Sequence, residues 1–247
     1  MGKRIRVQHR GKGGSVYRAH TINRVAPASY PPLSTSDFAQ TSVSGNVVEL
    51  FHDPGRGAPL ALLEFSDGRA FCSSAPEGLF VGQRIHRGPG STAEIGNILP
   101  LGRIREGTLV CSVEAKPGDG GVIAKASGAY AMVVSHTASG TELRLPSGRG
   151  VHLDDRCRAT IGVVASAGRT EKPFLKAGTK RFLMVSRGRL WPVTKGQAMT
   201  AASHPHGGGR HKHAGKGTTV SRNAPPGRKV GLIAARQSGR AKRAARQ

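Results

Sequence analysis

Short apolar stretches separated by Gly and Pro recur through the middle of the chain, without the long periodicity of amphipathic helices. This pattern predicts an all-β region. The predicted strands are Val43–Phe51, Leu60–Phe65, Arg69–Cys72, Gln83–His86, Leu109–Glu114, Val122–Ala126, Tyr130–His136, Glu142–Leu145, Val151–Leu153 and Ala159–Val164. The intervening turns at 53–55, 66–68, 117–121 and 146–148 combine Gly with Asp, Pro or Ser, which is typical of turns that need positive φ.

The spacing of these strands favours two small barrels in tandem over one sandwich, because the Pro and Gly residues of 117–121 interrupt the series near its midpoint. We therefore predict a mainly β fold with four parts. Residues 1–40 form a basic N-terminal extension and residues 41–117 form a first barrel. Residues 118–197 form a second barrel and residues 198–247 form a basic C-terminal extension.

Large apolar residues are concentrated in the middle of the chain. Residues 31–200 hold 42 Leu, Ile, Val and Phe in 170 positions, whereas the two flanks hold 9 in 77. The flanks fall below the roughly 20% that separates folded from disordered compositions. Only the middle is therefore expected to bury a core, and the flanks need a partner to order them.

Positive charge is concentrated in those same flanks. The chain has 38 Lys and Arg against 14 Asp and Glu, a net charge of +24, and neither residues 1–30 nor residues 201–247 contain an acidic side chain. Such a charge attracts polyanions, so nucleic acid or an acidic membrane surface is the expected partner. The chain has no 18-residue apolar run, no apolar stripe on its tails and no secretory signal, so we expect an intracellular nucleic-acid-binding protein without a membrane partner.

Glycine and aromatic content refine the expected mode of binding. Gly makes up 35 of 247 residues, about twice the usual fraction. The Gly-rich runs at 11–14, 118–121 and 207–209 would let backbone N–H groups approach phosphates, although flexible linkers are the alternative. Aromatic residues are only 4% of the chain, so phosphate and sugar contacts are expected to outweigh base stacking.

Four histidines lie within ten residues, at His204, His206, His211 and His213. Paired His-x-His sequences could bind zinc, but the basic residues around them repel a cation, and no Cys or carboxylate is near. We therefore predict no metal site and favour hydrogen bonds from these imidazoles to RNA. The cysteines Cys72, Cys111 and Cys157 match neither a zinc motif nor a disulfide framework and are expected to be buried. No pair of carboxylates is placed for acid–base catalysis, so no catalytic residue is predicted.

An ordered series of sequence strings is similar to one known family along residues 2–240. The strings are HDPGRGAPLA at 52–61, GNILPLG at 96–102, PGDGG at 117–121, ASGAY at 126–130, LPSG at 145–148, KPFLKAG at 172–178, HPHGGG at 204–209 and GRKVGLIAAR at 227–236. They resemble the universal large-subunit ribosomal protein L-two family, and the strings at 111–114 and 224–231 resemble its eukaryotic and archaeal branch. Residues 15–20 and the Asp37–Phe38 pair favour the eukaryotic cytosolic form.

The resemblance implies an OB-fold barrel followed by an SH3-like barrel, with basic extensions that enter ribosomal RNA. It implies a structural protein of the large ribosomal subunit that supports subunit association, tRNA placement and the peptidyl-transferase centre. Its partners would be large-subunit rRNA, neighbouring large-subunit proteins and the small subunit, with tRNA nearby. It would lie in the cytoplasmic ribosome, after nucleolar assembly in a eukaryote. No cofactor is implied, although rRNA could hold structural Mg²⁺ or K⁺.

Within this family the loop matching 204–209 lies nearest the peptidyl-transferase centre, which assigns His204, Pro205, His206 and Gly207 to that neighbourhood. His204 is interpreted as an RNA contact, because RNA performs the chemistry and a protein base would need hydrogen-bond reach to the reacting groups. Ser203 departs from the acidic residue that commonly precedes this histidine, so a carboxylate–imidazole pair is missing. Residues 21–44 match the family poorly and stay unassigned.

The candidate RNA-binding residues are basic, histidine and glycine residues of the tails, with a second set on the barrels. They are Arg4, Arg6, Arg10, Lys12, Arg18, Arg56, Lys116, Lys125, Lys172, Lys176, Lys180, Arg181, His204, His206, Gly207, Gly208, Gly209, Arg210, His211, Lys212, His213, Lys216, Arg222, Arg228, Lys229, Arg236 and Arg240. A solvated surface is the alternative for the barrel set. Trp191 is expected to pack against the second barrel. Two other functions stay open, namely a general RNA chaperone or double-strand binder, and a metal-dependent hydrolase built on the histidines.

Overall fold

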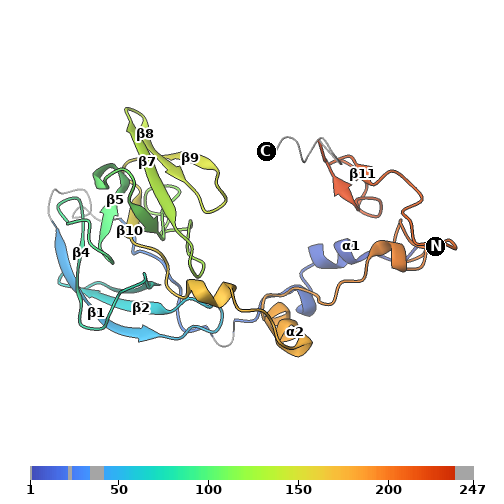
Figure 1. Ribbon diagram of the computed structural model, residues 1–247, viewed down its shortest axis with the longest axis horizontal. Coiled ribbons are helices and arrows are strands. Elements are labelled where there is room, and N and C mark those ends of the chain that lie inside the picture. Colours follow the sequence, from blue (N-terminus) through green and yellow to red (C-terminus); the bar gives the residue numbers. More distant parts are fainter. Residues whose placement is uncertain (1, 22–23, 34–41, 237–247) are drawn as a thin grey trace. The chain divides into compact units, whose positions relative to one another are not determined.

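The computed structural model describes residues 2–21, 24–33 and 42–236 of the chain, and it is mainly β (Figure 1). The chain divides into two compact units. Residues 21–173 form the first, which we call the barrel unit, and residues 1–20 together with 174–247 form the second, which we call the basic unit. Within the described ranges, no helix combines the length and the apolar character needed to span a membrane.

Ten strands of the barrel unit form one hydrogen-bonded sheet in the order β3-β2-β1-β4-β5-β10-β6-β7-β8-β9. The strands are β1 (Val43–Phe51), β2 (Leu60–Phe65), β3 (Ala70–Ser74), β4 (Arg84–Arg87), β5 (Ile98–Pro100), β6 (Leu109–Cys111), β7 (Ala131–Thr137), β8 (Gly140–Arg144), β9 (Gly150–Leu153) and β10 (Arg158–Ile161). Two short 3-10 helices, η3 (Leu101–Arg103) and η4 (Ala167–Thr170), belong to the same unit. Consecutive strands pair antiparallel in two meanders, β1-β2-β3 and β6-β7-β8-β9, and β10 returns between β5 and β6.

The barrel unit has two large hydrophobic cores that meet at β5. Ile98 packs in one core with Val47, Leu63 and Phe65, and the neighbouring Leu99 packs in the other with Val110 and other residues of the second meander. Successive side chains of a strand point to opposite faces, so one short strand can serve both cores. The second core therefore includes residues ahead of the predicted limit at 117, and the four predicted ranges stay a prediction.

Gly45 shows how close packing selects a residue in β1. It lies opposite Phe65 of β2, and a Cβ atom at position 45 would come 2.6 Å from the carbonyl oxygen of Glu64 and 2.6 Å from the Phe65 ring. Only a residue without a side chain allows that ring to lie across β1. Gly45 is therefore buried against Phe65, which belongs to the first core.

The predicted strands agree with the observed ones where the apolar pattern is long. The limits of β1 and β2 are confirmed, β5 was missed, and the predicted strand Val122–Ala126 is wrong apart from one bridge between Val113 and Ile123. Gly121 and Ala124 have φ of 82° and 54°, which an extended strand cannot accommodate. The predicted strand 109–114 ends at Cys111 for the same reason, because Ser112 has φ of 50°.

The basic unit contains short elements and almost no core. Its elements are α1 (Arg6–Gly11), η1 (Ser15–Tyr17), α2 (Ala177–Ser186), η5 (Gly196–Ala198) and the parallel pair β11 (Thr219–Val220) and β12 (Leu232–Ile233). Among its described residues, only Ile5 and Val230 are buried apolar side chains. The N–H of Lys3 donates to the carbonyl of Ala202 at 2.8 Å and that of His20 to Ser186 at 3.0 Å, which joins the N-terminal and C-terminal segments of this unit.

Helix α2 lies within the range predicted for the second barrel, residues 118–197, but it belongs to the basic unit. Buried residues end at Val164 in that region, and α2 buries none of its side chains. A helix is recognised in a sequence by apolar residues that recur on the face it buries. Because α2 buries no face, we did not expect a helix here. Trp191, which we expected to pack against the second barrel, belongs to the basic unit, where the Nζ atom of Lys180 in α2 lies 5.4 Å from the centre of its ring.

Candidate nucleic-acid interface

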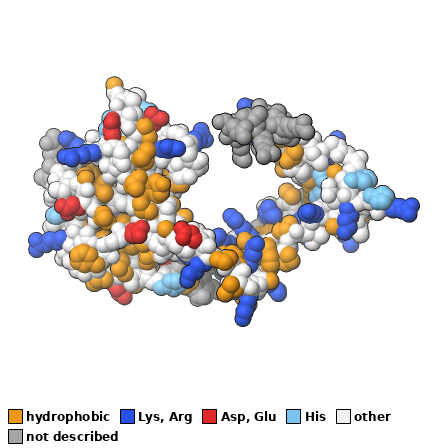
Figure 2. Space-filling view, in the orientation of Figure 1, with side chains coloured by type: hydrophobic (Ala, Val, Ile, Leu, Met, Phe, Trp, Pro, Cys, Tyr) orange, Lys and Arg blue, Asp and Glu red, His pale blue; other side chains and the backbone are white. Residues whose placement is uncertain are grey.

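The two units differ in net charge more than the flanks and the middle of the sequence do. The basic unit carries 23 Lys and Arg and no Asp or Glu, which leaves 15 basic against 14 acidic residues in the barrel unit. The net charges are therefore +23 and +1. Figure 2 shows acidic side chains over the strands of the barrel unit and Lys and Arg gathered over the basic unit. The basic unit contains no carboxylate side chain that could neutralise its cations, so it is the candidate surface for a polyanion.

Most predicted RNA-binding residues of the basic unit are exposed. The exposed ones are Arg4, Arg6, Arg10, Lys12, Arg18, Lys176, Arg181, Gly209, Arg210, His211, Lys212, His213, Lys216, Arg222, Arg228 and Arg236. Lys180, His204, Pro205, His206, Gly207, Gly208 and Lys229 are half-buried. Arg240 lies outside the described residues. Their role as RNA contacts stays a prediction, and it rests on composition, because an acid-free basic segment cannot neutralise its own charge.

Two predicted residues of the barrel unit bind its own backbone. The guanidinium of Arg56 pairs with Asp53, with Nε and Oδ2 2.7 Å apart, and donates to the carbonyl of Ala26 at 2.9 Å. The ammonium of Lys125 donates to the carbonyls of Ala28 and Gly121. Burial, and then the nearby charge of Arg56, lower the pKa of Lys125. Both side chains anchor residues 26–28, whereas Lys116 and Lys172 are exposed.

The segment 203–209 folds into a compact loop around two histidines. The N–H of Gly207 donates to the carbonyl of His204 at 2.9 Å, and that of Gly208 donates to Met199 at 3.0 Å. The His204 and His206 rings lie 5.1 Å apart at 64°. A Cβ atom on Gly196 would come 2.2–2.6 Å from the His204 ring, so Gly196 makes the space that this ring occupies. We call residues 203–209 the histidine loop.

A backbone hydrogen bond fixes the protonation of His204. The N–H of His206 donates to Nδ1 of His204 at 3.0 Å, so Nδ1 acts as an acceptor and carries no proton. The proton of the neutral ring is therefore on Nε2, which is a donor. Burial, and then the neighbouring His206, lower the pKa of His204 from its ordinary value of 6.5. The ring can donate to an RNA oxygen, but neither nitrogen is available as a base while this bond is intact.

We expect the histidine loop to open as pH falls below 6.5, the ordinary pKa of His204. The pKa in the folded loop is lowered, so the stability contributed by neutral His204 is present above 6.5 and is lost as pH falls through the lowered pKa. Protonation at Nδ1 removes the acceptor of the His206 N–H. Imidazole ¹⁵N shifts of His204 and the amide shift of His206, followed by NMR from pH 8 to 5, should change together. Titration of His204 without movement of the His206 amide would contradict the assignment.

Substituting Gly196 with Ala should displace the His204 ring. The added methyl group would overlap the imidazole, whereas Ala at Gly217 meets no atom within 4 Å and provides a matched control in the same unit. The bond between the His206 N–H and Nδ1 is expected to be lost in Gly196→Ala and kept in Gly217→Ala. The measurement is the population of the Nε2–H tautomer, read from imidazole ¹⁵N shifts at pH 8. Equal tautomer populations in both variants would show that Gly196 does not position the ring.

The described residues contain no group of three or more His, Cys, Asp or Glu side chains gathered as a metal site. The histidines at 211 and 213 are exposed, and their neighbours at 210 and 212 are basic. The geometry thus gives the hydrolase alternative no support. The cysteines Cys111 and Cys157 are buried, as predicted, and Cys72 is half-buried.

Comparisons with known proteins agree on one family. The family model "Ribosomal Proteins L2, RNA binding N-terminal domain" matches residues 2–87, and "Ribosomal Proteins L2, C-terminal domain" matches residues 94–229. The chain is 52% identical to the large ribosomal subunit protein uL2 of Korarchaeum cryptofilum, over 99% of this chain and 98% of that protein. It is 50% identical to uL2 of Hyperthermus butylicus, over 98% and 100% of the two chains, and 48% identical to uL2 of Haloarcula marismortui, over 97% and 98%.

These relatives are archaeal, which agrees with the eukaryotic and archaeal branch but does not favour the eukaryotic form that residues 15–20 suggested. In this family the N-terminal domain is an OB fold and the C-terminal domain is SH3-like, so the predicted fold class is confirmed. Family matches cover most of the chain, and its relatives are about half identical over their whole length. The chain therefore belongs to the ribosomal protein L2 family.

Proposed function

We propose that this protein is a structural constituent of the large ribosomal subunit and binds its rRNA. The observation that carries the proposal is the segregation of charge, which places 23 of 24 net positive charges in a unit without carboxylates and with almost no core. A unit of this kind needs a polyanion to become ordered. Family membership identifies that polyanion as rRNA. The protein is a structural component, so it acts through binding and not as an enzyme.

The mechanism follows from the contrast between the two units. The barrel unit is nearly neutral and has two hydrophobic cores, so it can dock on folded RNA by shape. The basic unit threads between RNA helices, where phosphates neutralise its exposed Lys and Arg side chains. Glycines of the histidine loop such as Gly208 and Gly209, with φ of 82° and 80°, bring backbone close to the RNA. Mg²⁺ or K⁺ in such a complex would be held mainly by rRNA.

The finer functions rest on the resemblance. The histidine loop, with His204, Pro205, His206 and Gly207, would lie near the peptidyl-transferase centre and support its architecture. Donation from Nε2 of His204 to an RNA oxygen is the contact that its tautomer supports. Subunit association, tRNA placement and contacts with neighbouring ribosomal proteins and the small subunit are part of this proposal. The proposal also places the protein in the cytoplasmic ribosome, with nucleolar assembly in a eukaryote.

Sedimentation of cell lysate through sucrose gradients at moderate and high salt tests the proposal. Each fraction is analysed for this chain and for other ribosomal proteins by mass spectrometry. We expect salt-resistant sedimentation with the large subunit at one copy per particle. A chain that stays at the top of the gradient, or spreads over many RNA fractions with similar salt dependence, would favour a general RNA chaperone instead.

A further inference from the structure

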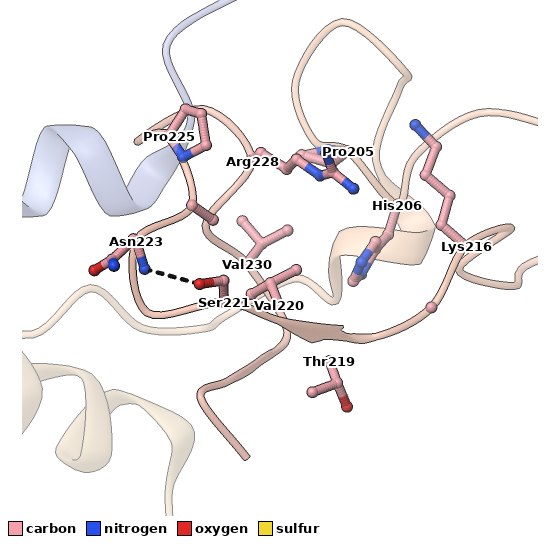
Figure 3. A pocket seen from close by; sticks show the side chains of 12 residues that line it. Pro205, His206, Lys216, Thr219, Val220, Ser221, Asn223, Pro225, Arg228 and Val230 are labelled. Atoms are coloured by element: carbon pink, nitrogen blue, oxygen red, sulfur yellow. Dashed lines mark hydrogen bonds between the residues drawn. The ribbon is translucent and has the colours of Figure 1, made fainter. Parts of the chain in front are cut away.

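A pocket opens in the basic unit beside the histidine loop, lined by Pro205, His206 and residues between 216 and 230 (Figure 3). Its volume is about 700 Å³, within the roughly 300–1,000 Å³ of small-molecule sites. The parallel pair β11 and β12 forms its frame, because the N–H groups of Leu232 and Ala234 donate to the carbonyls of Thr218 and Val220, each at 2.8 Å. The pocket is therefore built by backbone pairing and lies within one unit.

The centre of the pocket is apolar. Val220 and Val230 lie together in Figure 3, with Pro225 on one side and Pro205 on the other. Val230 is 4% exposed and is one of two buried apolar side chains among the described residues of the basic unit. Branched aliphatic and proline side chains make a surface on which a flat ring can pack.

The edge of the pocket is cationic and polar. Lys216 and Arg228 are exposed, and Asn223 and Ser221 add an amide and a hydroxyl group. The N–H of Asn223 donates to Oγ of Ser221 at 3.2 Å, which holds the loop between the strands in a turn. No acidic residue occurs anywhere in the basic unit. A ligand that combines negative charge with an apolar face would therefore complement this pocket.

We propose that this pocket takes one unstacked nucleotide of the RNA bound by the basic unit. The base packs on Val220 and Val230 between the two prolines, and its phosphate is held by Lys216 and Arg228. This inference rests on the proposed function and deepens it, because it adds recognition of a base to a surface otherwise described by phosphate contacts.

Chemical probing of isolated large subunits tests the inference with the full chain. In subunits with the wild-type protein, we expect one unpaired nucleotide protected from base- and 2′-OH-directed reagents. In subunits carrying Val220→Phe, which fills the pocket, its reactivity should rise about tenfold. Val193→Phe is the matched control, because Val193 is 62% exposed and outside the pocket. Identical probing patterns for wild type and Val220→Phe would overturn the inference.

A second measurement does not depend on assembly of the variant. The free full-length protein is titrated with adenosine 5′-monophosphate and separately with inorganic phosphate, while NMR follows the methyl groups of Val220 and Val230. We expect both valines to shift with the nucleotide and not with phosphate. Equal shifts with both ligands would reduce the pocket to a site for phosphate alone, and no shift with either would mean that it binds neither. Each of these results would overturn the inference. Failure of the wild-type chain to sediment with the subunit would instead refute the proposed function.

Discussion

Replacing Glu114 with Ala is expected to lower the free energy of unfolding of the barrel unit by about 3–5 kcal/mol, because it removes a carboxylate that pairs with a buried guanidinium. Glu114 and Arg158 have side-chain exposures of 0% and 4%, and Oε1 and Nη2 lie 2.7 Å apart. Nε of Arg158 donates to the same oxygen at 3.1 Å. A charge pair so far from solvent is costly to break, since the remaining charge cannot be hydrated.

The same ion pair fastens Tyr30 and Pro31, which precede the first strand, to β10. Arg158 donates to the carbonyl of Pro31 at 2.8 Å, and its guanidinium lies 5.3 Å from the centre of the Tyr30 ring. The Tyr30 hydroxyl is 2.6 Å from Oγ1 of Thr160 in β10. Glu114 also accepts from the N–H of Gly120, at 3.2 Å. Losing the carboxylate therefore loosens Tyr30 and the 118–121 turn together.

Urea unfolding of the full chain, followed by far-ultraviolet circular dichroism, measures this effect. Fluorescence is unsuitable because Trp191 lies in the basic unit. The matched control is Asp154→Ala, which removes the exposed pair with Arg156, where exposures are 39% and 66%. That variant should unfold nearly as the wild type does, because exposed pairs contribute little. A Glu114→Ala midpoint equal to that of the control would show that the buried pair does not hold the unit together.

The features that could be predicted from sequence are those that depend on local pattern or on composition. The strands β1 and β2 are marked by long apolar segments, and their limits follow directly. The basic unit is marked by an absence of acidic residues, which can be seen without knowledge of tertiary structure. The division predicted from sequence assigns the six basic residues of 174–200 to the core-forming middle, whereas in the structure they belong to the basic unit.

The features that were missed depend on interactions between distant residues. Arg158 and the carbonyl of Pro31 are 127 positions apart, and Lys125 and Ala28 are 97 apart. No spacing rule relates such residues, so the sequence pattern presents Lys125 and Arg56 as surface cations and Tyr30 as part of a tail. The strand β5 has three residues and α2 has no buried face, so neither leaves a periodic signal. The proton on Nε2 of His204 depends on one backbone bond within the folded loop.

Exchanging Arg228, Lys229 and Arg236 for Gln is expected to weaken rRNA binding by about 10²- to 10³-fold at 0.1 M salt. Removing one phosphate-binding cation lowers the slope of log K against log salt by about 0.7–0.9, so removing three lowers it by about 2–3. Arg228 and Arg236 are exposed and Lys229 is half-buried. They belong to a unit without acids, so no intramolecular partner within that unit compensates for their loss.

The control for that triple variant removes the same charge from the barrel unit, with Arg103, Arg105 and Arg149 changed to Gln. All three are exposed, and that unit has a net charge of only +1. If the basic unit threads between RNA helices, the control should keep most of the affinity and its salt slope. Binding to large-subunit rRNA, measured from 0.05 to 0.5 M salt, gives both quantities, and gradient sedimentation reports incorporation. Equal losses in the two variants would mean that net charge matters and its location does not. Normal incorporation of the first variant at high salt would mean that these three cations are not needed for binding, which contradicts the prediction.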